Sequence, residues 1–292
     1  MNDLAHTAAV DWLSEPDQHL LQHGEPGFPS MLADLADAPR ALYVKGDPSV
    51  LELPALAIVG SRNPTRGGER NAFEFSRHMA ASGFVIVSGL ATGIDSAAHR
   101  GAIAAGGLTV AFLGNGVDVV YPASNHELAH EVAANGALVS EYPLGTEPRR
   151  AYFPQRNRLI SGLSLGTLVI EAARQSGSLI TARLAAEQGR EVFAIPGSIH
   201  NPLSRGCHRL IRDGAKLVES ADDVHRAGLG MQSLGGRGKR DGSYIRPLQR
   251  EVLLEIRYLE KHYRERRSSS SAGEQFLEEE PQGVTGGQLV QL

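Results

Sequence analysis

The sequence has a single cysteine, Cys207, among its 292 residues. A lone cysteine excludes a disulfide framework and any metal site built from several cysteines. The sequence also lacks a GK[ST] phosphate loop and a GxGxxG pattern, and aromatic residues make up only 5% of it. We therefore expect no metal, no nucleotide or dinucleotide cofactor, and few side chains able to stack on a ligand.

Long apolar runs are also missing. No run of eighteen apolar residues occurs, and the first residues, MNDLAHTAAVDWLSEPD, lack a basic start followed by an apolar stretch. We therefore expect no membrane span and no secretory signal, and we expect a cytoplasmic protein. The formal net charge is −4. This acidic balance excludes a generally basic protein, so any binding of nucleic acid has to use a local patch.

The central part of the chain alternates apolar runs with helix-like segments. The runs lie at 55–60, 83–89, 108–114, 137–141, 167–172, 191–197 and 215–220. Runs that are apolar at nearly every position are typical of strands covered on both faces. The segments between them, such as SLITARLAAEQGR, carry small or apolar residues at helical spacing. This order predicts an α/β fold of the Rossmann-like, doubly wound kind, with a mainly parallel sheet and helices on both faces.

The flanks differ in composition from this core. We divide the chain into an N-terminal segment (1–54) that packs on the sheet edge, a core (55–227), a glycine-rich flexible linker (228–246), an amphipathic helix (247–267) and a disordered tail (268–292).

A cluster of arginines stands out in the stretch 149–158. It includes Arg156 and Arg158 of FPQRNRLISGLS, and no carboxylate occurs between Glu147 and Glu171. Such a cluster fits either a solvated helix start or a site for a polyanion. On a helix, Arg156 and Arg158 point roughly 200° apart, so one ligand reaches both only by wrapping around the helix start. An extended single strand of nucleic acid does this more easily than one nucleotide.

Two glycine-containing loops follow predicted strands. The first, IVGSRNPTRGGE, places Ser61 and Arg62 before a helix, where backbone amides and a guanidinium attract phosphate oxygens. The second, QSGSLITAR, places Gly177 and Ser178 in the same position. Each loop also fits a purely structural role, as a tight turn in the first case and with Ser178 as a helix N-cap in the second.

A third stretch, AIPGSIHNPLSRGCHRLIRDGA, has no acid between Glu191 and Asp213. It carries three arginines and two histidines, and Cys207 adjoins His208. We do not expect a nucleophilic cysteine here, because no catalytic dyad can be read from the spacing.

Taken together, these stretches resemble the DprA (Smf) family of bacterial DNA-processing proteins. The residues that carry the resemblance are IVGSR (58–62), SGLATGIDSAAHRGA (88–102), FLGNGVDVVYPASN (112–125), SEYPLG (140–145), FPQRNRLISGLS (153–164) and SGSLITARLAAEQGREVFAIPG (176–197). Family members usually have a helical domain before the Rossmann part, and many end in a winged-helix domain. We expect neither module in this sequence.

The resemblance implies a dimer without catalytic activity that binds single-stranded DNA and loads the RecA recombinase during natural transformation. Carried over residue by residue, it implies DNA contacts at Ser61, Arg62, Arg156, Asn157 and Arg158, with Gly177 and Ser178 as further candidates. Phe153 is the candidate for base stacking.

One alternative is an enzyme, a nucleoside-monophosphate phosphoribohydrolase of the lysine-decarboxylase-like family, which carries a PGG-x-GT-x-x-E loop. The stretch SGLSLGTLVIEA supplies Gly166 and Thr167 but not the PGG, and Glu171 arrives one residue late. In a strand, that shift turns a carboxylate to the other face. We therefore favour the non-enzymatic interpretation.

Overall fold

The computed structural model of the chain describes residues 11–229. The predicted helix at 247–267 and the predicted tail at 268–292 lie outside the described residues, as does the predicted linker from residue 230 onward. No helix within residues 11–229 is both long enough and apolar enough to cross a membrane.

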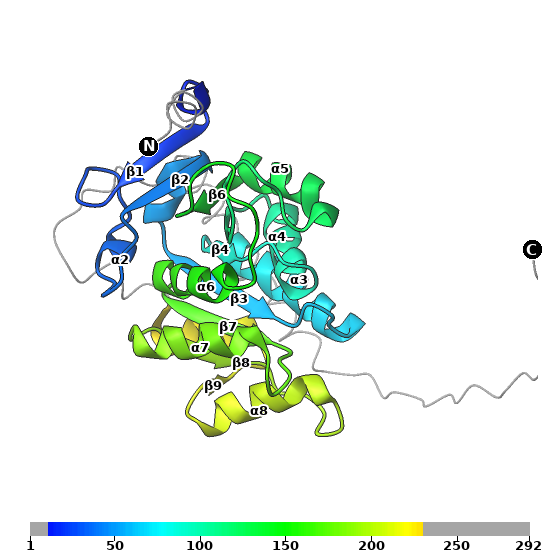
Figure 1. Cartoon of the computed structure of the whole chain (residues 1–292). Coiled ribbons are helices and arrows are strands. Elements are labelled where there is room, and N and C mark those ends of the chain that lie inside the picture. Colours follow the sequence, from blue (N-terminus) through cyan, green and yellow to red (C-terminus); the bar gives the residue numbers. More distant parts are fainter. Residues whose placement is uncertain (1–10, 230–292) are drawn as a thin grey trace, which may run out of the picture. The chain divides into compact units, whose positions relative to one another are not determined.

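The described residues form a nine-stranded sheet in the order β1-β2-β6-β5-β4-β3-β7-β8-β9 (Figure 1). The strands are β1 (Gln18–Gln22), β2 (Ala41–Gly46), β3 (Ala55–Gly60), β4 (Val85–Ser88), β5 (Thr109–Phe112), β6 (Gly136–Ser140), β7 (Gly166–Ile170), β8 (Glu191–Ala194) and β9 (Lys216–Leu217). The pairs β1–β2 and β2–β6 are antiparallel and all other pairs are parallel. The predicted mainly parallel α/β sheet is confirmed.

The N-terminal segment is joined to the core more closely than its sequence predicts. Residues 18–46 contribute two strands to the sheet, with Val44 of β2 opposite Val139 of β6. In β2 the buried residues Leu42 and Val44 alternate with half-buried ones. This two-residue period is typical of an antiparallel strand that has one face in the core, and it differs from the continuous apolar runs of the central strands.

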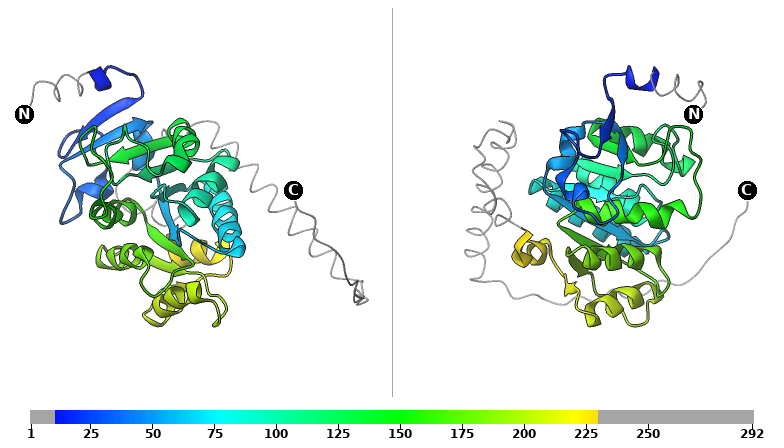
Figure 2. Two further views of the ribbon diagram at one scale, coloured as in Figure 1. Left: turned by 45° about the vertical axis from the view of Figure 1, so that its right-hand side comes forward. Right: turned by 60° about the vertical axis from the view of Figure 1, so that its left-hand side comes forward.

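Helices cover both faces of the sheet (Figures 1 and 2). One face carries α3 (Arg66–Ala81), α4 (Ile94–Ala104), α5 (His126–Ala134) and α9 (Ala221–Val224). The other carries α2 (Ser30–Ala33), α6 (Tyr152–Leu163), α7 (Gly177–Glu187) and α8 (Arg205–Arg212). Short helical turns lie at η1 (Pro48–Glu52), η2 (Ala123–Asn125), η3 (Pro202–Ser204) and η4 (His225–Leu229).

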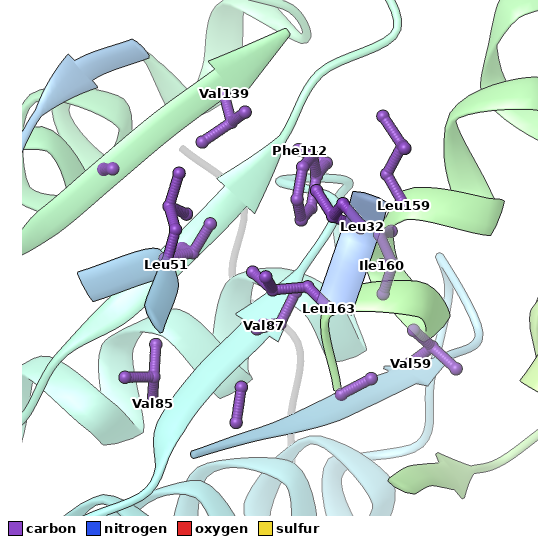
Figure 3. Packing of buried hydrophobic residues seen from close by; sticks show 14 of the residues in the cluster. Leu32, Leu51, Val59, Val85, Val87, Phe112, Val139, Leu159, Ile160 and Leu163 are labelled. Carbon is purple, nitrogen blue, oxygen red and sulfur yellow. The ribbon is translucent and has the colours of Figure 1, made fainter. Parts of the chain in front are cut away.

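The core under α6 fixes the position of that helix. Leu159, Ile160 and Leu163 are buried against Val87 and Phe112 of the strands (Figure 3). Burying each such side chain stabilises the fold by about 1.5–3 kcal/mol. These contacts hold the second half of α6 firmly against the sheet.

The order of the strands reverses at β3. From β3 the chain first builds outward through β4, β5 and β6, and it then returns to add β7 and β8 on the other side. In doubly wound sheets, ligands bind outside the carboxyl ends of the strands near such a switch point. The loops that follow β3, β4, β5 and β7 meet at this edge. Two of the predicted site stretches, at 61–62 and 177–178, lie in or directly after them, and the third, at 153–158, follows β6.

Candidate nucleic-acid interface

The loop after β3 presents Arg62 to solvent and uses Ser61 to hold its own shape. The Ser61 carbonyl accepts a hydrogen bond from the Ile94 amide at 3.1 Å, and its hydroxyl accepts one from the Asn63 amide at 3.1 Å. The loop packs tightly on Gly93, where a side chain would lie 2.5 Å from the Ser61 carbonyl oxygen. Gly93 also has a φ of 79°, which glycine adopts without strain. The Arg62 side chain is exposed and forms no hydrogen bond or ion pair within residues 11–229.

Arg62 lies over the ring of Phe153, which is paired with Tyr121. Its guanidinium carbon is 5.7 Å from the centre of the Phe153 ring, and the Phe153 and Tyr121 rings are 5.6 Å apart with an interplanar angle of 32°. The Tyr121 side chain is 46% exposed. The half-buried Phe153 ring packs closely against Gly114, where a Cβ would be only 2.8 Å from the ring. We call Arg62, Tyr121 and Phe153 the stacking platform.

Arg156 lies beneath this platform. Its side chain is buried, and Nη1 donates hydrogen bonds to the carbonyl oxygens of Gly89 (2.9 Å) and Phe112. Its guanidinium carbon is 6.0 Å from the Phe153 ring centre. Burial lowers the pKa of Arg156 to about 10, and the nearby Asp95 carboxylate partly offsets this effect. Arg156 therefore keeps its charge at neutral pH.

Asp95 holds the same loop from its other side. Its buried carboxylate accepts hydrogen bonds from the amides of Gly89 (3.2 Å) and Ala91 (3.4 Å). Burial raises the pKa of Asp95, and the charge of Arg156 acts in the opposite direction. The Gly89 carbonyl thus accepts a hydrogen bond from a buried cation, and the Gly89 amide donates one to a buried carboxylate. This double contact fixes the loop that supports Arg62.

Arg158 points to another part of the molecule. Its Nη2 lies 2.6 Å from Glu141, which follows β6, and its Nε lies 2.9 Å from Asp37 of the N-terminal segment. The Arg158 side chain is only 15% exposed. No carboxylate lies between Glu147 and Glu171 in the sequence, but two acids outside that stretch, Asp37 and Glu141, neutralise Arg158. Asn157 is half-buried, and its side chain forms no hydrogen bond with the described residues.

The structure thus brings Ser61, Arg62, Phe153 and Arg156 together and turns Arg158 away from them. A DNA contact by Arg156 or Arg158 stays a prediction. The contacts present in the fold give both side chains a structural role, because Arg156 donates to two carbonyl oxygens and Arg158 pairs with two carboxylates inside the protein. Arg156 Nε and Arg158 Nη1 are buried without a hydrogen-bond partner among the described residues.

The sequence analysis missed three aromatic residues of this edge. Tyr121 belongs to the platform, while Tyr142 and Tyr152 form a second stacked pair, with ring centres 4.3 Å apart and an interplanar angle of 26°. The Arg149 guanidinium carbon lies 5.8 Å from the Tyr152 ring centre. The adjacent aromatics Tyr152 and Phe153, close behind Arg149, were the available signal in the sequence.

Gly177 and Ser178 form the first turn of α7 and do not precede the helix. The N-cap is Ser176 and not Ser178, because the Ser176 hydroxyl accepts from the Ser178 amide at 3.3 Å. The two hydroxyls are 2.6 Å apart, and Ser178 is buried whereas Gly177 is exposed. Within the described residues, no hydrogen bond, ion pair or ring contact joins this turn to the platform.

A carboxylate occupies the switch point itself. Glu171 accepts hydrogen bonds from the Thr65 amide (2.8 Å) and the Thr65 hydroxyl (2.6 Å), and more weakly from Asn201 (3.4 Å). Thr65 in turn caps α3 by accepting from the Gly68 amide at 3.0 Å. A pocket of about 170 Å³ adjoins these residues. Two donors at this helix start, the amide and the hydroxyl of Thr65, therefore already serve an internal negative charge.

Comparison with known proteins identifies the family. Residues 19–227 match the model of DNA recombination-mediator protein A. The chain belongs to this family. It is 47% identical to protein Smf of Escherichia coli over 249 residues, which cover 85% of this chain and 66% of that protein. It is also 47% identical to DNA processing protein DprA of Streptococcus pneumoniae over 197 residues, which cover 68% and 70% of the two chains.

Two solved structures of DprA proteins share the fold. The X-ray structure of the Streptococcus pneumoniae protein matches with a TM-score of 0.71 and 42% identity over 77% of this chain and 78% of that one. DNA processing protein A from Helicobacter pylori matches with a TM-score of 0.66 and 31% identity over 73% of this chain and 95% of that one. The structure of that protein gives insight into its single-stranded DNA binding mode. The resemblance to the DprA family that the sequence motifs indicated is confirmed.

Proposed function

We propose that this chain is a recombination mediator that holds single-stranded DNA on the stacking platform. The observation that carries the proposal is the placement of Arg62 beside Phe153 and Tyr121 at the carboxyl edge of the sheet. An unpaired guanidinium next to the half-buried Phe153 and the exposed Tyr121 suits a phosphate and a neighbouring base. The single-stranded DNA binding mode described for the Helicobacter pylori relative supports it.

The platform residues contribute to binding in different ways. Arg62 neutralises a phosphate, which releases a counterion and makes the affinity depend on salt. Phe153 and Tyr121 offer ring faces to bases, which stack with little regard to their identity. Such contacts provide affinity without reading a sequence. A base inside a duplex has both faces covered by its neighbours, so this site favours single strands.

We further propose that the protein acts in the cytoplasm as a homodimer and that it protects incoming DNA and loads RecA during natural transformation. Family membership supports this part of the proposal.

We propose that the protein has no catalytic activity in this role. A phosphoribohydrolase would need a free catalytic carboxylate and room for the phosphate of its substrate. The Glu171 carboxylate is bonded to Thr65 at the start of α3, so it would repel a phosphate at that position. Release of free base from nucleoside monophosphates, lost in Glu171→Gln, would contradict this view.

The proposal is tested by fluorescence anisotropy with labelled single-stranded and duplex oligonucleotides over a series of salt concentrations. We expect the full chain to bind single strands more tightly than duplexes of the same length, with little preference among bases. Arg62→Ala should weaken the binding of single strands and reduce the slope of log affinity against log salt by about 0.7.

The matched control is Arg77→Ala, which also removes one exposed arginine charge, in this case from α3. Arg77 already pairs with Glu74 at 2.7 Å, so we expect the affinity and the salt slope to stay as in the unsubstituted protein. Equal or tighter binding of duplex DNA, or an unchanged affinity of Arg62→Ala at every salt concentration, would overturn the proposal.

A further inference from the structure

The arrangement of the stacking platform occurs a second time at the start of α6. The Arg149 guanidinium carbon lies 5.8 Å from the centre of the Tyr152 ring, much as Arg62 lies over Phe153. The Tyr152 ring stacks on Tyr142, with ring centres 4.3 Å apart and an interplanar angle of 26°. Both arrangements therefore consist of an exposed arginine, an aromatic residue of α6 and a tyrosine from a loop. We call Arg149, Tyr142 and Tyr152 the tyrosine set.

The tyrosine set lies beside the platform along the same edge of the sheet. Tyr152 and Phe153 are consecutive in the chain, so their Cα atoms are about 3.8 Å apart and their side chains leave the helix about 100° apart. Phe153 contacts Tyr121, which comes after β5, and Tyr152 contacts Tyr142, which comes after β6. Arg62 comes after β3, and the order β6-β5-β4-β3 is continuous in the sheet. A strand that leaves Arg62 across β4 and β5 therefore reaches the tyrosine set.

The arginine of the tyrosine set is available to an anion. The Arg149 side chain is exposed and forms no ion pair within residues 11–229, although Glu147 is only two residues away in the sequence. Tyr142 and Tyr152 are half-buried, so the guanidinium is the exposed part of the set. A guanidinium that rests on a ring keeps its charge and its donors for a phosphate, and its outer face can stack on a base.

The tyrosine of the loop adds no negative charge that would oppose a phosphate. Burial, and next the charge of Glu141, raise the pKa of Tyr142 to about 12. The phenol is therefore neutral at neutral pH. Glu141 itself is paired with Arg158 at 2.6 Å.

The loop that carries Tyr142 is held in place before any ligand binds. The Thr146 carbonyl accepts a hydrogen bond from the Gly116 amide at 2.8 Å, and the Asp118 carboxylate accepts from the Gly145 amide at 2.9 Å. The Tyr142 hydroxyl lies 3.1 Å from a side-chain oxygen of α6 and donates to it. These contacts tie the loop after β6 to the loop after β5 and to the helix. The tyrosine set is thus a preformed surface, which lowers the entropic cost of binding.

We propose that the tyrosine set is a second contact site for the same single strand of DNA, which runs from the stacking platform toward β6. Arg149 binds a phosphate and supports a base on its outer face, and the stacked rings of Tyr152 and Tyr142 hold the guanidinium in position. This inference rests on the proposed function, because it takes the platform as the place where the strand is first held.

The test measures the binding of a labelled single strand of about 12 nucleotides, since such sites on proteins span roughly 4–16 nucleotides. Fluorescence anisotropy over a salt series gives the affinity and the salt slope of the full chain and its variants. We expect Arg149→Ala to weaken binding and to reduce the slope by about 0.7. The double variant Arg62→Ala/Arg149→Ala should reduce the slope by about 1.4, because the two arginines hold two different phosphates.

Tyr152→Leu tests the contribution of the rings. We expect about 5-fold to 140-fold weaker binding, the loss that corresponds to one stacked base. The salt slope should stay unchanged, because no charge is removed. Thermal melting shows whether the variant keeps its fold, and the exposed Arg149→Ala tests the inference by itself if Tyr152→Leu melts at a much lower temperature.

The matched control is Arg150→Ala, which removes the same charge one residue further along the chain. Arg150 is exposed and forms no ion pair or ring contact within the part of the chain that the structure describes. We expect its affinity and its salt slope to stay as in the unsubstituted protein.

The outcomes separate this inference from the proposed function. If the unsubstituted protein does not bind the single strand, or if Arg62→Ala binds it as well as the unsubstituted protein at every salt concentration, the proposed function is wrong and the inference falls with it. If Arg62→Ala weakens binding while Arg149→Ala and Tyr152→Leu do not, the platform stands and the tyrosine set has no role. An equal loss of slope in Arg149→Ala and Arg150→Ala would show only diffuse attraction and would also overturn the inference.

Discussion

The guanidinium carbon of Arg62 lies 5.7 Å from the centre of the Phe153 ring, although the two residues come from a loop after β3 and from the first turn of α6. This contact joins the proposed phosphate-binding group to the proposed base-stacking group. At an exposed site a cation over an aromatic ring contributes about 0.5–1 kcal/mol. The contact therefore orients both side chains without making either unavailable to a ligand.

The first prediction separates these two roles. Phe153→Leu should weaken single-stranded DNA binding by about 1–3 kcal/mol for a lost stacked base, with the salt slope unchanged, because no charge is removed. Arg62→Gln should weaken binding and reduce the slope by about 0.7. Anisotropy titrations over a salt series measure both quantities. The assignment fails if Phe153→Leu alters the slope as much as Arg62→Gln does.

The second prediction concerns Arg156. Arg156→Ala leaves the carbonyls of Gly89 and Phe112 and the carboxylate of Asp95 without their buried cation. Removing one partner of a buried charge pair costs about 3–5 kcal/mol. For a domain of this size, that loss lowers the melting temperature by roughly 6–20 °C. Calorimetry measures the shift.

Arg183→Ala is the control for Arg156→Ala, because its 3.5 Å ion pair with Glu187 is fully on the surface and we expect a change of at most about 1 kcal/mol. An Arg156→Ala protein that melts like the unsubstituted one but binds DNA weakly would show that the main role of Arg156 is to contact DNA.

The third prediction concerns Arg158, which joins the N-terminal segment to α6. Arg158→Ala removes contacts to Asp37 and Glu141. Hydrogen bonds to charged groups contribute about 1.5–3 kcal/mol, so we expect the free energy of unfolding to fall by about that amount. The affinity for single-stranded DNA should stay within about twofold, a change of about 0.4 kcal/mol. Urea unfolding and anisotropy test the two halves of this prediction, and a large loss of affinity without a loss of stability would reverse it.

The sequence predicts the fold well because the parallel strands have an unambiguous pattern. The predicted run at 55–60 coincides with β3. The strands β4 (85–88) and β5 (109–112) lie inside the predicted runs at 83–89 and 108–114. The strands β1 and β2 were missed because their apolar residues alternate and the surrounding sequence is rich in turn residues. The helix α8 was missed because it is short and rich in arginine, so few of its residues are apolar.

The site was only partly predictable, for a physical reason. That the Arg62 loop lies at the carboxyl edge of the sheet could be predicted, because loops after parallel strands share one edge, whereas Phe153 was named only through the family resemblance. The burial of Arg156 could not, since it depends on carbonyl groups 67 and 44 residues away in the sequence. Whether an arginine meets solvent or two carbonyl oxygens is decided by packing between distant segments, and a local pattern does not contain that information.

The fourth prediction concerns His99, which is buried in α4. Its Nδ1 lies 2.7 Å from the Thr109 hydroxyl, and that hydroxyl donates to the Ile86 carbonyl at 2.8 Å. Since the hydroxyl proton is already used, Nδ1 carries the hydrogen and donates to Thr109. Nε2 is then the site of any further protonation, and it is buried without a hydrogen-bond partner within the described residues. Burial, and next the charge of Arg156, lower the pKa of His99 to about 3.

This pKa makes the stability of the fold depend on pH. The ordinary pKa of histidine is about 6.5, so between that value and about 3 the unfolded chain binds a proton that the folded chain does not. Stability therefore falls as the pH decreases through this window, by up to about 1.4 kcal/mol for each pH unit. Asp95 has a raised pKa and acts in the opposite direction, because its folded form takes up a proton first.

The variant His99→Gln isolates the contribution of the histidine, since a glutamine amide can donate to Thr109 without titrating and Asp95 is present in both proteins. The difference in unfolding free energy between the two proteins should shrink by about 2 kcal/mol from pH 7 to pH 5. Urea unfolding at the two pH values measures this change. If the two proteins lose stability in parallel, His99 is not kept neutral by its burial, and another group causes the loss of stability in acid.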